Sequence, residues 1–196
     1  MNLPNTLTML RIVLAFAFIL FLFTDGLFYK ILAFATFFLA SLTDLLDGFL
    51  AKRNNQITDF GKLMDPIADK ILILSAFIAF VELGIIPAWM VIVVILREVA
   101  ITAMRGLAYT KGKVIPADGV GKHKTVSQVV TIFVILLYIV FREGTESVFK
   151  FWTPSTAATF GSTIYYLMIV AVIFTVISGV SYLVKNRSLY SNEKRD

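Results

Sequence analysis

Four aspartates occur as two pairs in segments that are otherwise strongly apolar. Asp44 and Asp47 are three residues apart, and Asp65 and Asp69 are four residues apart. Both spacings place two carboxylates on one face of a helix. An aspartate within a membrane costs on the order of 3 kcal/mol, and converging carboxylates also repel one another. A bound cation removes both penalties, so the pattern predicts a divalent-metal site.

The kind of metal follows from the ligand atoms. Carboxylate oxygens suit hard cations such as Mg²⁺ or Mn²⁺, whereas zinc usually recruits histidine or cysteine. Paired ions about 3.5–4 Å apart are a recurrent arrangement for phosphoryl displacement, so we expect two ions. The alternative is that the aspartates are helix caps or solvated interfacial charges, and Asp65-Pro66 does resemble a helix start.

Small residues accompany the aspartates. Gly48 and Ala51 follow Asp47, and Gly61 precedes Asp65. Small side chains allow two helices to approach closely. They also leave room for a flat ligand beside the metals, and spacing alone does not separate these two interpretations.

The elements that must position these residues are long apolar runs. The 196 residues are 58% hydrophobic and 16% charged, whereas soluble domains are roughly half apolar and a quarter charged. A spanning helix needs about 20 mostly apolar residues. Six runs satisfy this, at about Leu7–Phe23, Leu27–Ala51, Pro66–Leu83, from after Pro87 to Tyr109, Lys124–Phe141 and Ser162–Val184. We expect an all-α integral membrane bundle of six transmembrane helices, a single domain over residues 1–196, with Asn5 or Thr6 capping the first helix.

The placement of lysine and arginine predicts the orientation of the helices. The connections Lys52–Lys62 and Lys111–Lys124 and the C-terminal tail are basic, whereas the opposite side holds only Lys30, Arg142 and Lys150. Basic residues are enriched on the cytoplasmic side. We therefore expect a multi-pass protein of the cell membrane with both termini and the aspartates facing the cytoplasm. The net charge of +5 then reflects topology and contacts with membrane lipids, and we expect no nucleic-acid partner.

The aspartate pairs belong to a longer pattern. The segment Asp44-Leu45-Leu46-Asp47-Gly48-Phe49-Leu50-Ala51-Lys52 is followed at fixed separations by Gly61, Asp65 and Asp69. This pattern resembles the signature of the CDP-alcohol phosphotransferases, and seven of its eight fixed positions match. The exception is Lys52, where the family usually carries arginine, so the charge is retained but the bidentate fork is lost. Arg53 is the neighbouring candidate for that phosphate contact.

The resemblance implies a membrane enzyme that transfers a substituted phosphate from a CDP-linked lipid to an alcohol, and it also implies a homodimer. The metals would be held by Asp44, Asp47, Asp65 and Asp69, and Asp69 would take the proton from the acceptor hydroxyl. Metal charge would offset negative charge at the phosphorus and make CMP a better leaving group. Contacts with the CDP donor would come from Gly48, Ala51, Lys52, Arg53 and Gly61, together with Asn5 and Arg11. For Arg11, a side chain that reaches outward to the membrane surface is an equal alternative.

Basic and polar residues near the same face predict where the acceptor binds. They are Arg97, Arg105, Lys122, Lys124 and Thr125. Charge-assisted hydrogen bonds from such residues suit a phosphate-bearing acceptor. A buried arginine needs a partner, so Arg97 is expected to pair with Glu98, Asp118 or a ligand anion. His123, the only histidine, is expected to be a solvated bystander.

The segment Gly121–Gln128, the Arg97-Glu98 pair and the start Leu3–Arg11 resemble one bacterial branch of the family. Its donor is CDP-diacylglycerol, its acceptor is glycerol 3-phosphate, and its products are phosphatidylglycerol phosphate and CMP. A sibling enzyme that uses inositol phosphate, serine or phosphatidylglycerol is the nearest alternative. A metal transporter would need polar residues across the whole membrane, whereas the outer halves of the predicted helices are almost wholly apolar. A non-catalytic scaffold would leave four costly aspartates unexplained.

Overall fold

The computed structural model is all-helical in the residues that it describes, which are 3–54, 59–110, 120–144 and 153–187. They form α1 (Leu3–Phe23), α2 (Leu27–Asn54), α3 (Asp59–Glu82), α4 (Ala88–Thr110), α5 (Val120–Glu143) and α6 (Pro154–Lys185). Within these ranges, the side chains of residues 3–8, 44–54, 59–69, 109–110 and 120 lie outside the description. The predicted all-α class is confirmed.

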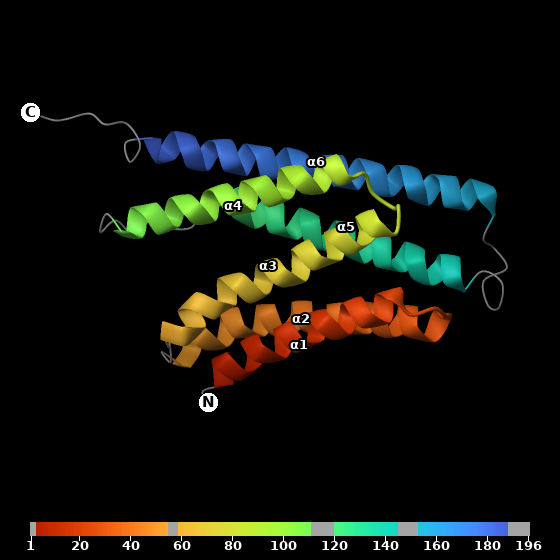
Figure 1. Cartoon of the computed structure of the whole chain (residues 1–196), viewed down its shortest axis with the longest axis horizontal. Helices are drawn as coiled ribbons and strands as arrows, with labels where there is room; N and C mark the ends of the chain where they lie inside the picture. The colour runs from red at the N-terminus through yellow and green to blue at the C-terminus, as the bar shows by residue number, and fades with distance from the viewer. Residues whose placement is uncertain (1–2, 55–58, 111–119, 145–152, 188–196) are drawn as a thin grey trace, which may run out of the picture.

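Successive helices run in opposite directions (Figure 1). The start of α1, the end of α2, the start of α3 and the ends of α4 and α6 all lie at the left of that view. The helix α1 packs against α2 and α3, whereas α5 packs against α6 and α2, and α4 packs against α6. The helix ends that carry the aspartates therefore share one end of the bundle with the ends of α4 and α6.

Aromatic packing holds together the helices that carry the aspartates. Phe18, Phe37, Phe77 and Phe80, from α1, α2 and α3, are fully buried. The ring centroid of Phe37 lies 5.4 Å from that of Phe18 and 5.3 Å from that of Phe133 in α5. Tilted and edge-on ring pairs at such distances are favourable. The core therefore fixes α2 and α3 relative to α1 and α5.

Much of the outer surface is apolar. Phe16 is 70% exposed and Tyr166 is 68% exposed, and many other large apolar side chains share this exposure. Soluble monomers rarely expose large contiguous apolar patches. Among the described residues, the helical segments Gly121–Glu143 and Pro154–Lys185 are long and apolar enough to cross a membrane. These features support a membrane-associated protein.

The helix α6 begins earlier than the sequence analysis predicted, at Pro154 rather than Ser162. The Thr153 hydroxyl accepts a hydrogen bond from the Thr156 backbone N–H at 3.3 Å, and the Thr156 hydroxyl accepts one from the Thr153 backbone N–H at 2.8 Å. This capping box and the proline at the first position define a helix start. The predicted start was wrong because hydrophobicity marks only the apolar part of a helix.

Besides α5, which begins at Val120 and not at Lys124, two further helix starts were predicted wrongly for the same reason. The helix α1 begins at Leu3, so Asn5 and Thr6 lie inside the helix and do not cap it. The helix α3 begins at Asp59, so Asp65-Pro66 lies inside the helix and not at its start. In both cases a polar first turn precedes the apolar run. The helix-cap interpretation of Asp65 is thereby removed.

Charged side chains tie the helices together at the opposite end of the bundle. Buried Lys30 donates hydrogen bonds through Nζ to the Leu22 carbonyl at 2.8 Å and to the Thr24 carbonyl at 2.9 Å. Glu143 accepts a hydrogen bond from the Gly26 N–H at 3.0 Å, and Gly26 has φ +107°, a conformation that favours glycine. Lys30 therefore satisfies carbonyl groups at the C-terminal end of α1.

Candidate active site

The two aspartate pairs lie on helices that meet at one end of the bundle. Asp44 and Asp47 belong to α2, and Asp65 and Asp69 belong to α3. The helix α2 ends where α3 begins, at the left of Figure 1. The aspartate side chains lie outside the described residues, so their convergence on a metal stays a prediction. The same holds for the predicted donor contacts of Asn5, Gly48, Ala51, Lys52, Arg53 and Gly61.

A buried carboxylate joins two of the predicted acceptor residues. Glu98 of α4 accepts hydrogen bonds through Oε1 from Arg97 Nη1 at 2.9 Å and from Lys124 Nζ of α5. The exposed fractions of these side chains are 14% for Arg97, 11% for Glu98 and 9% for Lys124. Buried charges are tolerated when they are paired and hydrogen-bonded. Glu98 is thus a partner of Arg97, and it shares its carboxylate oxygen between Arg97 and Lys124.

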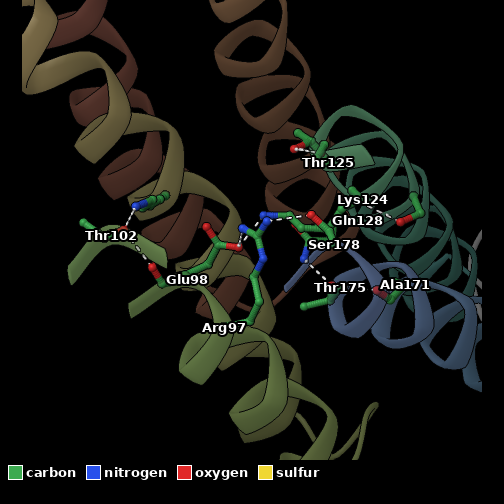
Figure 2. A network of polar contacts seen from close by, with 12 residues as sticks. Arg97, Glu98, Thr102, Lys124, Thr125, Gln128, Ala171, Thr175 and Ser178 are labelled. Carbon is green, nitrogen blue, oxygen red and sulfur yellow. Dashed lines mark hydrogen bonds and ion pairs between the residues drawn. The ribbon is translucent and has the colours of Figure 1, made fainter. Parts of the chain in front are cut away.

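The helix α6 contributes the next contacts around Arg97. Arg97 Nη2 donates a hydrogen bond to Ser178 Oγ at 2.7 Å, and Ser178 is buried. Figure 2 shows the Arg97 side chain pointing from α4 toward the residues of α5 and α6. Gln128 Nε2 of α5 donates to the buried Thr175 hydroxyl of α6 at 3.3 Å. Within the described residues, Arg97 Nε is buried and has no hydrogen-bond partner, so the guanidinium retains an unused donor.

A second set of contacts connects this cluster with α3. Thr102 Oγ1 donates a hydrogen bond to the Glu98 backbone carbonyl at 2.7 Å and also contacts Lys70 Nζ. Lys70 directly follows Asp69 in the sequence. Side chains of α3 and α4 are therefore linked immediately beside the backbone position of the predicted general base.

Two other predicted acceptor residues on α5 lie apart from the Glu98 carboxylate. Lys122 is exposed. Thr125 is half-buried, and its hydroxyl donates to the Gly121 carbonyl at 3.3 Å. His123 is exposed, and its ring centroid lies 6.4 Å from that of Phe174. This exposure agrees with the prediction that His123 is a solvated bystander. Of the basic residues on α5, the structure brings Lys124 to the cluster.

The two remaining arginines of the predicted site whose side chains are described, Arg105 and Arg11, have different surroundings. Arg105 of α4 is exposed, and its guanidinium lies 5.6 Å from the centroid of the Tyr182 ring in α6, a cation–π contact. Arg11 of α1 is only 1% exposed. Its side chain lies inside the bundle, which opposes the interpretation that it reaches outward along the membrane surface.

An apolar cavity of about 290 Å³ lies between α2, α3 and α5. Its wall includes Phe38, Ser41, Leu42, Leu72, Val129 and Phe133. Ser41 Oγ is buried and has no hydrogen-bond partner among the described residues, and Ser41 precedes Asp44 by three residues in α2. The cavity can therefore hold an apolar chain one helical turn from the predicted metal site.

Comparison with known proteins identifies the family. A model of the family described as CDP-alcohol phosphatidyltransferase matches residues 1–184. The chain is 36% identical to the CDP-diacylglycerol–glycerol-3-phosphate 3-phosphatidyltransferase of Bacillus subtilis, over 94% of this chain and 95% of that protein. It is also 36% identical to a probable phosphatidylglycerophosphate synthase of Mycobacterium tuberculosis, over 94% of this chain and 81% of that protein. The chain belongs to the CDP-alcohol phosphatidyltransferase family, and the resemblance inferred from the aspartate signature is confirmed.

A more distant relative has the same name as the Bacillus protein. It is the enzyme of Rickettsia felis, which is 30% identical over 92% of this chain and 93% of its own length. The similarity to these three relatives extends over nearly the whole chain and is not confined to the segment with the aspartates.

Sequence reasoning missed the contribution of α6 to the site. Ser178 lies far from Arg97 in the sequence, and α6 was interpreted only as a membrane span. A signal was present, because Ser178, Gly179 and Ser181 interrupt an apolar run. Small and polar residues within a spanning helix often mark its contact with another helix.

Proposed function

We propose that this chain transfers the phosphatidyl group from CDP-diacylglycerol to glycerol 3-phosphate, giving phosphatidylglycerol phosphate and CMP. The names of the Bacillus and Rickettsia relatives specify this donor and this acceptor. The structural observation that carries the proposal is the buried cluster of Arg97, Glu98 and Lys124. Its two cationic side chains and the unused Nε donor of Arg97 suit the phosphate of the acceptor.

In the proposed reaction, the acceptor hydroxyl oxygen bonds to the phosphorus that carries diacylglycerol. The bond from this phosphorus to the oxygen of CMP breaks, and CMP leaves. Asp69 takes the proton of the hydroxyl group as general base. Arg97 and Lys124 hold the phosphate of the acceptor, so that its hydroxyl group is presented to the donor.

The metal assignment rests on the chemistry of the donor set. Asp44, Asp47, Asp65 and Asp69 offer only carboxylate oxygens, which fit Mg²⁺ or Mn²⁺. Two such ions, when bound, supply positive charge at the reacting phosphate. The positions of both pairs, near the end of α2 and the start of α3, support one shared site.

We also propose that all six helices span the cell membrane, with both termini and the active site facing the cytoplasm. The alternating direction of the helices (Figure 1) and the exposed apolar side chains support this arrangement. The apolar cavity beside Ser41 suits an acyl chain of the donor. A homodimer is proposed from the family resemblance.

An assay with several acceptors tests the function. Purified protein with CDP-diacylglycerol and Mg²⁺ is offered labelled glycerol 3-phosphate, inositol phosphate, serine or phosphatidylglycerol in separate reactions. We expect CMP release and a labelled lipid with glycerol 3-phosphate. Preference for another acceptor would overturn the acceptor assignment, and absence of CMP with every acceptor would overturn the proposed reaction.

A further inference from the structure

We propose that Ser178 and Gly179 of α6 are positioning residues that fix the Arg97 guanidinium for the phosphate of the acceptor. The inference rests on the proposed function, in which Arg97 and Lys124 bind that phosphate. It assigns to α6 a part in acceptor affinity that its apolar sequence does not suggest.

Gly179 determines the path of the Arg97 side chain. A Cβ atom built at residue 179 would lie 3.2 Å from Arg97 Cγ, which is tighter than ordinary van der Waals contact. At the other described glycines, a Cβ would find no such atom closer than 3.9 Å. The backbone of α6 thus lies directly against the aliphatic stem of Arg97, and a methyl group at this position would require the stem to shift by a few tenths of an ångström.

Ser178 and Glu98 fix the orientation of the guanidinium plane. Arg97 Nη2 donates to Ser178 Oγ at 2.7 Å, and Nη1 donates to Glu98 Oε1 at 2.9 Å. The two terminal nitrogens are therefore held by different helices, and a planar group held at two points cannot rotate freely. Figure 2 shows Ser178 and Glu98 on either side of the Arg97 head group.

The held guanidinium still has donors for an anion. It carries five N–H groups, and the contacts with Ser178 and Glu98 use two of them. The Nε donor is buried without a hydrogen-bond partner among the described residues. A guanidinium that is already oriented loses less conformational freedom when it binds an oxyanion. Ser178 and Gly179 should therefore act on the affinity for the acceptor and not on the affinity for the lipid donor.

Kinetics of full-chain variants test this assignment. Ser178→Ala removes the acceptor of the Nη2 hydrogen bond, and Gly179→Ala displaces the Arg97 stem. Gly161→Ala is the matched control, because it lies in the same helix and a Cβ there meets nothing within 4 Å. We expect the KM for glycerol 3-phosphate to rise about tenfold in the first two variants, because the misplaced guanidinium loses one charge-assisted hydrogen bond to the acceptor phosphate. The KM for CDP-diacylglycerol and all constants of Gly161→Ala should stay at the wild-type values.

A purely structural role in packing α4 against α6 gives a different result. It would reduce the amount of folded enzyme and the maximal rate per milligram, while the KM for glycerol 3-phosphate would stay unchanged. That outcome in Ser178→Ala would overturn the inference. If Gly179→Ala does not fold, the KM of Ser178→Ala for glycerol 3-phosphate still distinguishes the positioning role from a packing role.

A double-mutant cycle separates failure of this inference from failure of the proposed function. Binding of glycerol 3-phosphate is measured by calorimetry, which does not require turnover. Arg97→Ala should weaken binding, and Ser178→Ala should add no further loss in that background. If Arg97→Ala weakens binding and Ser178→Ala alone does not, the inference is wrong and the acceptor site stands. If Arg97→Ala leaves binding unchanged, the proposed acceptor site is wrong.

Discussion

Replacement of Glu98 by glutamine is expected to destabilise the bundle strongly. The Glu98 carboxylate is the shared partner of Arg97 and Lys124, and the three side chains are between 9% and 14% exposed. Glutamine has nearly the same shape and retains an oxygen that accepts hydrogen bonds. The change therefore removes charge and little else, and it leaves two largely buried cations without the carboxylate that they share.

The loss of stability in Glu98→Gln can be estimated from this burial and pairing. Removal of one partner from a buried ion pair costs about 3–5 kcal/mol. Glutamine can still accept one neutral hydrogen bond, so we take about 3 kcal/mol, the lower end of that range. At about 2–4 °C per kcal/mol for a chain of this length, the Tm should fall by about 6–12 °C.

Intrinsic tryptophan fluorescence of purified protein in detergent measures this Tm, because the chain contains Trp89 and Trp152. Glu82→Gln is the matched control, since Glu82 is an exposed glutamate at the end of α3, and its Tm should change by only about 1 °C. Combining Glu98→Gln with Lys124→Met restores the net charge of the cluster and should recover part of the loss. If the Tm of Glu98→Gln stays within about 2 °C of wild type, the cluster does not have the energetic role assigned to it.

Three further predictions concern the chemistry and the helix boundaries. Asp69→Asn should lower turnover by at least about 100-fold, as expected for loss of a general base, while CDP-diacylglycerol binding is partly retained; near-normal turnover would disprove the role of Asp69 as base. Treatment with a chelator should abolish activity, and Mg²⁺ or Mn²⁺ should restore it, so full activity in excess chelator would contradict the metal assignment. Thr153→Ala should lower stability by about 1 kcal/mol through loss of the capping box of α6 without changing either KM, and an unchanged Tm would show that the cap does not contribute to stability.

The sequence predicted the helices well because their apolar runs are long, but it placed several helix starts too late. The residues of the interval Pro154–Thr159 are small or polar, so a criterion based on hydrophobicity excluded it from α6. Thr153 and Pro154 were nevertheless available as a helix-start signal, because a hydroxyl cap and a proline at the first position are local features. Asp65-Pro66 shows the opposite error, since a start signal lies within a helix that begins at Asp59.

The candidate site likewise contains residues that the sequence could predict and residues that it could not. The aspartate signature could be recognised because its residues are close in the sequence, and the family that it indicated is confirmed over residues 1–184. The partner of Arg97 could only be narrowed to three choices, because pairing depends on how α4 and α5 pack. Ser178 interrupts an apolar run, which marks a helix contact, but the sequence could not identify Arg97 as its partner, since the two residues are 81 positions apart in the chain.

Anomalous X-ray diffraction from crystals grown with Mn²⁺ and CDP tests the central claim most directly. We expect manganese peaks surrounded by carboxylate oxygens of Asp44, Asp47, Asp65 and Asp69, where the end of α2 meets the start of α3. Aspartate side chains that point to separate surfaces, with no manganese between them, would contradict it.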